Sequence, residues 1–331
     1  MPITVARKKS AWKEIQSRTK IKKRTKLALG VLALIAGLLI ASWAIRFTQS
    51  LFSPYIWNGQ FNINLLVRNP RIFLLSYNPK EEKITILNIP DELFLDVPFG
   101  FGKWQLRSIY ELGQSQKQIG GDRLLADTLT NFLAIPIDGF LDFSALQDQK
   151  SATEVVEFLR KNPFSGLNFL SALKTDLTIW ELLRLKLGMG RVRFDKVKEL
   201  NLDKLSVLDR ENLPDGTPVY TTDPVKLDSV LSDFADPAIT FEHKTIAVLN
   251  TTGQPQLAQK VARLITNLGG NVIITTNASQ KLQKTLIQGE QSLTLRRLKQ
   301  IFRLSDKINS SDENIISSRA QINVLLGEDR L

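Results

Sequence analysis

The chain has 331 residues and no cysteine, which excludes disulfide bonds, thiolate catalysis and cysteine-ligated zinc or iron–sulfur sites. Its single histidine, His243, excludes a metal site with several histidine ligands. The formal net charge is +11, but residues 1–26 alone contain ten basic side chains and one acid. The rest of the chain is therefore nearly neutral.

The longest apolar segment, residues 27–45, contains no charged side chain. A helix rises about 1.5 Å per residue, so this segment is long enough to cross the roughly 30 Å hydrocarbon core of a bilayer. Segments rich in Lys and Arg stay on the cytoplasmic side of a span. The pattern predicts a basic cytoplasmic tail (1–26), a transmembrane signal-anchor (27–45) and a connector (46–59). We expect a single-pass protein of the cell membrane whose C-terminal domains are extracytoplasmic.

Two alternatives to this anchor are a cleaved signal peptide and a DNA-binding arm. Ser42 and Ala44 loosely resemble a cleavage site, but the basic and apolar segments are both longer than in ordinary signal peptides. A basic arm also suits nucleic acid phosphates, but here an apolar span follows it directly. We therefore expect the bilayer, including its anionic headgroups, as a partner, and no direct contact with nucleic acid.

Residues 60–237 are predicted to form a first α/β domain. Apolar runs at 61–67, 72–77 and 83–89 predict strands, and Asn78-Pro79 between the last two runs predicts a hairpin. The further predicted elements are a helix at 121–133 that ends before Pro136, a strand at 137–143, and helices at 152–161 and 178–187, the last with a capping box formed by Thr178 and Glu181.

Residues 238–331 are predicted to form a second, smaller α/β domain. An apolar strand at 245–250 is followed by a turn, and Pro255 is expected in the first turn of the next helix. The remaining predicted elements are a strand at 272–275, a helix at 292–302, a polar loop at 305–319 and a last strand at 322–326.

Two segments of the second domain resemble the LytR C-terminal domain. Residues 248–253, Val-Leu-Asn-Thr-Thr-Gly, are similar to its opening strand and turn, and residues 322–329 are similar to its end. The first domain resembles a LytR-CpsA-Psr (LCP) domain at residues 75–80, 83–90 and 133–138. LCP proteins transfer anionic glycopolymers from a polyprenyl-pyrophosphate carrier to peptidoglycan. They hold the pyrophosphate with arginines and a magnesium ion with aspartates.

The chain departs from the LCP pattern at the positions that carry this chemistry. Arg68 matches the arginine of the family's Arg-x-Asp-Thr, but Pro70 stands where the aspartate belongs. The family's Ile-Pro-Arg-Asp becomes Ile-Pro-Asp-Glu at residues 89–92, so an acid replaces an arginine. A pyrophosphate needs several converging cations or a metal ion, and the sequence shows neither.

The resemblance therefore implies a reduced LCP relative in cell-wall biogenesis. We expect it to bind envelope glycopolymer, a polyprenyl-pyrophosphate lipid carrier or a partner protein, without transferase chemistry and without a cofactor. One alternative is a divergent glycopolymer–peptidoglycan ligase, which would use magnesium. Another is a structural scaffold of the envelope. Enzymatic activity is left open, with the balance against it.

Four basic residues of the first domain are candidates for an anion or lipid-phosphate site: Arg68, Arg71, Lys103 and Arg107. The competing interpretation is ordinary solvated surface charge. Asp91 and Glu92 are expected on a strand with side chains on opposite faces, which excludes a shared site. Four aromatic residues in a nearby loop region are expected to pack in the core or to line a groove: Phe94, Phe99, Phe101 and Trp104.

Overall fold

The computed structural model describes residues 56–69, 71–116, 118–144, 151–160, 173–304 and 318–330. The predicted tail and transmembrane segment, and most of the predicted connector, lie outside these residues. Across the described ranges, no helix is both long and apolar enough to cross a bilayer. Residues 55–331 form one compact unit.

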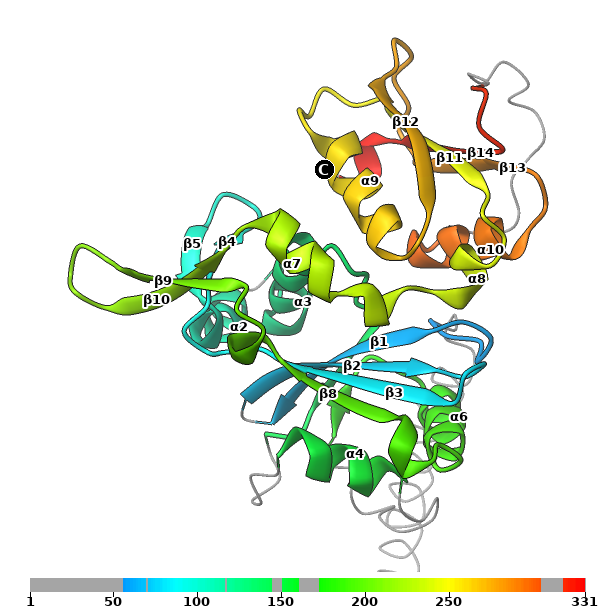
Figure 1. Cartoon of the computed structure of the whole chain (residues 1–331). Helices are drawn as coiled ribbons and strands as arrows, with labels where there is room; N and C mark the ends of the chain where they lie inside the picture. The colour runs from blue at the N-terminus through cyan, green and yellow to red at the C-terminus, as the bar shows by residue number, and fades with distance from the viewer. Residues whose placement is uncertain are drawn as a thin grey trace, which may run out of the picture. The chain divides into compact units, whose positions relative to one another are not determined.

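A six-stranded mixed sheet is the centre of the first region (Figure 1). Its strands are β1 (Ile63–Asn69), β2 (Arg71–Asn78), β3 (Lys83–Asn88), β6 (Gly139–Asp142), β7 (Lys174–Thr175) and β8 (Val197–Asn201). The order across the sheet is β7-β6-β1-β2-β3-β8. Strand β2 is antiparallel to β1 and β3, whereas β6 and β8 run parallel to their neighbours β1 and β3.

Both faces of this sheet are buried, because alternate apolar side chains point to opposite sides. Leu65, Leu75 and Ile86 belong to one core, which α4 (Ala152–Arg160) and α6 (Ile179–Met189) cover. The opposite core contains Leu66, Leu74 and Leu87, together with residues of α2 (Leu106–Ser115) and α3 (Gly121–Leu133). The result is a three-layer α/β/α arrangement, which confirms the predicted α/β class (Figure 1).

The local signals in the sequence explain several element boundaries. In the β2–β3 hairpin, the Oδ1 atom of Asn78 accepts hydrogen bonds from the backbone N–H groups of Lys80 (3.0 Å) and Glu81 (3.1 Å). At α6 the capping box is present: the Thr178 hydroxyl accepts from the Glu181 N–H, and the Glu181 carboxylate accepts from the Thr178 N–H. The predicted hairpin, the helix at 121–133 and this capping box are confirmed.

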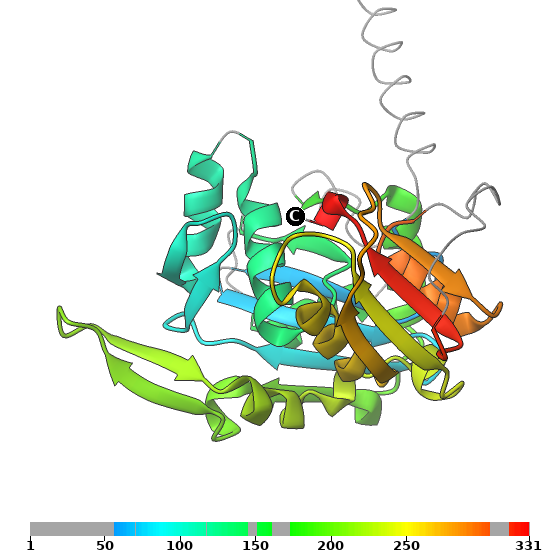
Figure 2. The same cartoon turned by 90° about the horizontal axis from the view of Figure 1, so that it is seen from above.

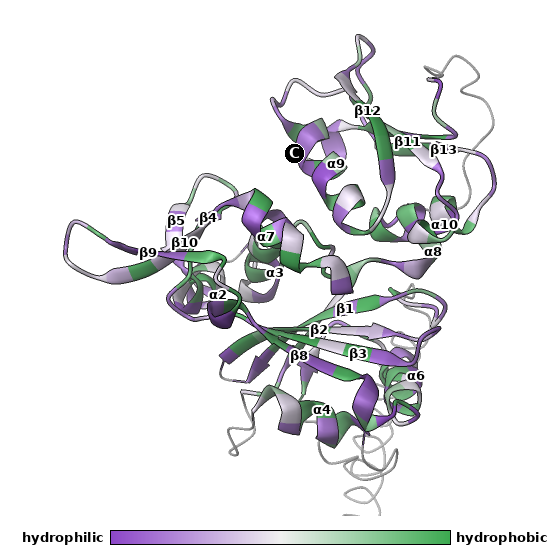
Figure 3. Ribbon diagram, in the orientation of Figure 1, coloured by the Kyte–Doolittle hydropathy of each residue, from purple (hydrophilic) through white to green (hydrophobic). Residues whose placement is uncertain are grey.

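Several elements of the first region were not predicted: β4 (Phe94–Val97), β5 (Gly102–Gln105), α2, η1 (Phe194–Lys196), β8, η2 (Leu202–Lys204), β9 (Leu208–Asn212), β10 (Pro218–Thr222), α7 (Pro224–Val230), η3 (Ser232–Phe234) and α8 (Pro237–Thr240). The β9–β10 ribbon extends away from the sheet in both views (Figures 1 and 2). Its colouring is mainly hydrophilic (Figure 3), and the side chains of β9 beyond Leu208 are exposed.

The aromatic segment that was predicted as a loop forms the β4–β5 hairpin instead. Leu95 and Val97 are buried and hold this hairpin against the core. Phe101 also packs on that core, but Phe99 and Trp104 remain exposed at 51% and 40%. Phe94 is half-buried, so the four aromatic residues differ in burial and do not form one cluster.

A second sheet of four strands belongs to the C-terminal region. Its elements are β11 (Thr245–Asn250), α9 (Leu257–Asn267), β12 (Asn271–Asn277), β13 (Leu286–Gly289), α10 (Leu293–Ile301), β14 (Ile322–Leu326) and η4 (Glu328–Arg330). The strand order is β12-β11-β14-β13, and only β13 is antiparallel to its neighbour. The three predicted strands and two predicted helices are confirmed, whereas β13 was missed. Helix α9 begins after Gln256, which has a left-handed φ of 62°, so Pro255 lies outside the helix.

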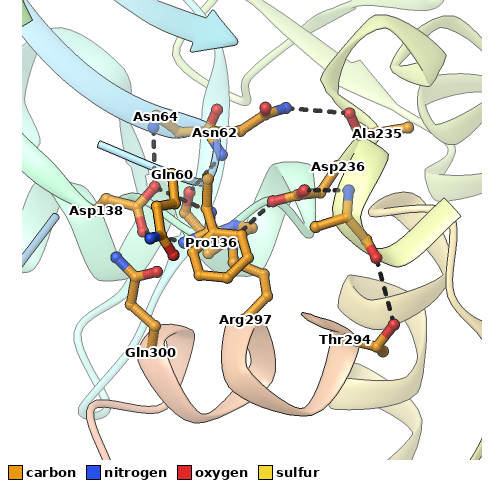
Figure 4. Close-up of polar contacts among 12 residues, drawn as sticks. Gln60, Asn62, Asn64, Pro136, Asp138, Ala235, Asp236, Thr294, Arg297 and Gln300 are labelled. Atoms are coloured by element: carbon orange, nitrogen blue, oxygen red, sulfur yellow. Dashed lines mark hydrogen bonds and ion pairs between the residues drawn. The ribbon is translucent and has the colours of Figure 1, made fainter. Parts of the chain in front are cut away.

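A buried ionic cluster joins the two regions (Figure 4). Arg297 of α10 has no exposed side-chain surface, and its Nε donates to the Asp236 carboxylate at 2.7 Å. Its Nη2 lies 3.4 Å from Oδ2 of Asp138, which precedes β6. The same Asp138 oxygen accepts the backbone N–H of Asn64 at 2.8 Å. Burial raises the pKa of Asp138, and the Arg297 guanidinium opposes that rise.

Candidate functional site

A cleft of about 570 Å³ lies where β2 begins and β3 ends. Among the described residues that line it, the charged ones are Arg71, Asp91, Glu92, Glu199 and Asp203. Four carboxylates thus face one guanidinium. The amide side chains of Asn69, Asn88 and Asn201 contribute further hydrogen-bonding groups. The lining is therefore acidic and rich in carboxamides.

Strand pairing positions the central part of this lining. Asn88 at the end of β3 lies opposite Asn201 at the end of β8. The Asn88 amide donates to Glu199 Oε1 at 2.6 Å and to Asn201 Oδ1 at 2.8 Å. The other oxygen of Glu199 accepts from the Thr153 hydroxyl of α4 at 2.8 Å. The Glu199 carboxylate is therefore held in one orientation by groups from two other elements.

Asp91 and Glu92 follow β3 in a turn rather than in a strand, which corrects the sequence expectation. The turn closes with a hydrogen bond from the Leu93 N–H to the Pro90 carbonyl at 3.2 Å. Because a turn does not impose strand alternation, both acids line the same cleft. Burial raises the pKa of Asp91, Glu92 raises it further, and the guanidinium groups of Arg71 and Arg107 oppose the rise.

Arg68 already has acidic partners. Its guanidinium lies 3.1 Å from the Asp142 carboxylate and 3.3 Å from that of Glu111, and it donates to the Ser144 hydroxyl at 3.2 Å. Its central carbon lies 3.9 Å from the ring centroid of Tyr110, a cation–π distance. An anion at Arg68 would have to compete with two carboxylates.

The other three predicted basic residues lie in different surroundings. Arg71 lines the cleft. Arg107 lies at the start of α2, and the charges of both arginines oppose the rise in the pKa of Asp91. Lys103 lies on β5, where the strand register places it opposite Asp96. Arg71 and Arg107 therefore lie near Asp91, whereas Arg68 is paired with Asp142 and Glu111. Lys103 lies apart from them on the β4–β5 hairpin.

Sequence reasoning missed Asn88, Glu199, Asn201 and Asp203 as lining residues. Asn88 ends a strand that was predicted, but its partners Glu199 and Asn201 lie more than a hundred residues further along, on the unpredicted β8. The segment 197–204 alternates charged and apolar residues without a motif. Only the pairing of β8 with β3 brings these side chains together.

The LCP resemblance implies a magnesium ion held by aspartates. Within the part of the chain that the structure describes, no group of three or more Asp, Glu, His or Cys side chains is placed to hold a metal ion. The carboxylates of the cleft can act as hydrogen-bond acceptors. With four carboxylates and three carboxamides among its described residues, the cleft offers many groups that can hydrogen-bond to hydroxyls.

Comparison with known proteins identifies the second domain. Residues 244–329 match the family model described as "LytR cell envelope-related transcriptional attenuator". No curated protein sequence matches the chain.

Several solved structures are similar at low sequence identity. TagT from B. subtilis is 17% identical over 55% of this chain and 93% of its own, with a TM-score of 0.38. The transcriptional regulator yvhJ from Bacillus subtilis is 15% identical over 53% of this chain and 97% of its own, with a TM-score of 0.41.

A further similar structure is the LytR-CPS2A-psr family protein YwtF (TagT) with bound octaprenyl pyrophosphate lipid. It is 17% identical over 54% of this chain and 91% of its own, with a TM-score of 0.38. At these TM-scores, the function of the first domain has to be argued from its own residues. The family match is confined to the second domain, where residues 244–329 are similar to the LytR C-terminal family.

Proposed function

We propose that this chain is a single-pass membrane protein of the cell envelope that binds the sugar part of a glycopolymer without transferring it. The envelope role is supported by the LytR C-terminal domain, whose family description is cell envelope-related. The anchor is supported by the uncharged segment 27–45 and by the basic segment before it. The reduced LCP domain would then face the wall side of the membrane.

The observation that carries the proposal is the sign of the charge in the cleft. The two segments that resemble the LCP pyrophosphate motifs, residues 68–71 and 89–92, meet at this one cleft through Arg71 and Asp91. Among its described lining residues are four carboxylates and one arginine. Bringing a pyrophosphate into this cleft would place like charges together at close range, which is unfavourable.

A saccharide suits the same lining. Carboxylate and carboxamide oxygens accept hydrogen bonds from hydroxyl groups, and carboxamide N–H groups donate to them. The cleft volume of about 570 Å³ lies in the range of sites for small ligands. Glu199 is oriented before any ligand arrives, because Asn88 and Thr153 hold it, which lowers the entropic cost of binding.

The test is a binding measurement on the full chain in lipid nanodiscs. Calorimetric titration with a disaccharide of N-acetylglucosamine and N-acetylmuramic acid is expected to show saturable binding. Titration with a polyprenyl pyrophosphate is expected to show none, with or without magnesium. Pyrophosphate binding without saccharide binding would contradict the proposal and support the ligase. Binding of neither ligand would also contradict it and support a scaffold.

A matched pair of variants locates the binding. Glu199→Gln keeps the shape of the side chain but removes its negative charge and replaces one of the two carboxylate oxygens that accept from Asn88 and Thr153. We expect it to weaken saccharide binding roughly tenfold, the value of one charge-assisted hydrogen bond. Glu211→Gln on the exposed β9 makes the same chemical change outside the cleft and is expected to have no effect.

A further inference from the structure

Helix α6 has apolar side chains on two sides rather than one. Leu182, Leu185 and Met189 are buried in the core under the sheet. Ile179, Trp180 and Leu187 are exposed at 45%, 48% and 45%. A helix of 3.6 residues per turn places these three and the half-buried Leu183 within an arc of about 100°. In Figure 3 the helix has largely hydrophobic colour.

Basic residues border this exposed apolar stripe. Lys186 and Arg184 lie on its two sides by the same helical geometry, and Arg191 follows the helix. A cleft of about 650 Å³ is lined by Arg184, Arg191, Trp180, Leu183 and Leu187, and Glu82 is the one acid among its described lining residues. An apolar helix face with Trp at its edge and Lys or Arg on its flanks is the pattern of a helix that lies in a membrane interface.

A short stretch of chain separates this helix's first contacts from the predicted anchor. The described chain begins at Ile56, eleven residues after the predicted span ends at residue 45, and these can extend about 40 Å at most. The next residue is fixed directly to α6, because the Trp57 N–H donates to Glu181 Oε1 at 2.6 Å. Trp57 is 1% exposed, and its indole N–H donates to the Phe61 carbonyl at 2.7 Å.

Gly59 makes the contact between connector and helix close. A Cβ atom at Gly59 would lie 2.6 Å from Cδ of Arg184, so the connector packs against the side of α6 that carries this arginine. The first described residues therefore contact two helices: Trp57 and Gly59 meet α6, and the Ile56 carbonyl accepts from the Gln300 amide of α10 at 2.7 Å. The other large apolar side chains that are exposed among the described residues lie outside α6: Phe99, Trp104, Phe194, Val225, Phe241 and Ile273.

We propose that the outer face of α6, formed by Ile179, Trp180, Leu183 and Leu187 with Arg184 and Arg191, docks on the surface of the membrane that holds the anchor. The partner is a bilayer with anionic headgroups: the apolar stripe enters the interface and the guanidinium groups contact lipid phosphates. This inference rests on the anchored topology of the proposed function. Docking of α6 would set the orientation of the first domain, and of its acidic cleft, relative to the membrane.

The absence of cysteine makes a direct test possible, because one introduced cysteine gives one labelled site. The full chain would be reconstituted in vesicles of phosphatidylethanolamine and phosphatidylglycerol, with a nitroxide at Trp180→Cys or, separately, at Leu187→Cys. Collisions of the nitroxide with oxygen and with a water-soluble nickel chelate report its depth. The control is Phe241→Cys, an aromatic position exposed at 87% and far along the chain from α6.

We expect oxygen to relax the labels at 180 and 187 several-fold more effectively, relative to nickel, than the label at 241. Adding Arg191→Glu should reduce that difference in anionic vesicles and leave it unchanged in purely zwitterionic ones. Labels at 180 and 187 as accessible to nickel as the label at 241 would overturn the docking proposal while leaving the anchor intact. Spin–spin broadening between labels would overturn it by showing a second copy on this face. A chain that fails to enter the bilayer would refute the anchored topology, and the docking proposal with it.

Discussion

Two groups of acidic side chains in this molecule have opposite surroundings. At the junction of the two regions, Asp138 and Asp236 are buried, and Arg297 lies between them with no exposed surface. In the cleft at the end of β3, Asp91, Glu92, Glu199 and Asp203 face one arginine. Charge is nearly balanced inside the junction and strongly unbalanced in the cleft.

The difference separates structural from functional acids. A buried charge is tolerated only when it is paired and hydrogen-bonded, and each junction acid meets that requirement through Arg297 and backbone N–H groups. The cleft acids remain in contact with water and need no such pairing. They are available to a ligand, and in the proposed function their negative charge disfavours binding of a pyrophosphate.

The largest expected effect is on the junction. Arg297→Met leaves Asp138 and Asp236 buried without their cation, so we expect the free energy of unfolding to fall by about 3–5 kcal/mol. Urea unfolding followed by tryptophan fluorescence would measure it. The adjacent exposed Arg296→Met removes the same charge from the same helix and should change stability by less than about 0.5 kcal/mol. Equal effects of the two variants would show that the junction charges do not matter.

A smaller loss of unfolding free energy is expected when Asp138, one of the two acids paired with Arg297, is changed. Asp138→Asn keeps the side chain's shape but replaces one charged acceptor of Arg297, whereas Asp236 still pairs with that guanidinium. The expected loss is about 1–3 kcal/mol, again from urea unfolding. A loss as large as that of Arg297→Met would mean that Asp236 alone cannot satisfy the arginine.

Removing an acid from the cleft should affect ligand binding rather than stability. Asp91→Asn removes one of four neighbouring negative charges, and Asp91 makes no ion pair at hydrogen-bond distance in the described structure. We therefore expect unchanged or slightly higher stability, within about 0.5 kcal/mol, together with weaker saccharide binding. Parallel unfolding and calorimetric titration would measure both. A clear loss of stability would place Asp91 among the structural acids.

The smallest effect concerns pH. Burial and Glu92 raise the pKa of Asp91 above its ordinary value of about 3.9. The native state therefore holds this proton more tightly than the unfolded state, and stability falls as pH rises from the ordinary value through the raised one. The difference in unfolding free energy between wild type and Asp91→Asn, measured from pH 4 to pH 7, should show this slope. If the wild type instead gains stability relative to the variant as the pH rises over that range, the pKa of Asp91 is lowered rather than raised.

The sequence predicted the elements whose signals are local. The alternating strands, the Asn78 turn and the Thr178–Glu181 capping box depend on neighbouring residues and were confirmed. Strand β8 and the ribbon β9–β10 were missed, because their side chains are polar and their pairing is set by residues far away in the chain. The candidate site was predicted only in part for the same reason. Arg71 was recognised because it lies near a family motif, whereas Glu199 was missed because only the pairing of β8 with β3 brings it to the cleft.

The central claim is that the acidic cleft binds sugar and rejects pyrophosphate, and hydrogen exchange tests it most directly. The full chain in nanodiscs would be exchanged alone, with the N-acetylglucosamine–N-acetylmuramic acid disaccharide, and with inorganic pyrophosphate and magnesium. The account predicts slower exchange at residues 88–93 and 199–203 with the saccharide and no change with pyrophosphate. Protection of these segments by pyrophosphate, and not by the saccharide, would contradict it.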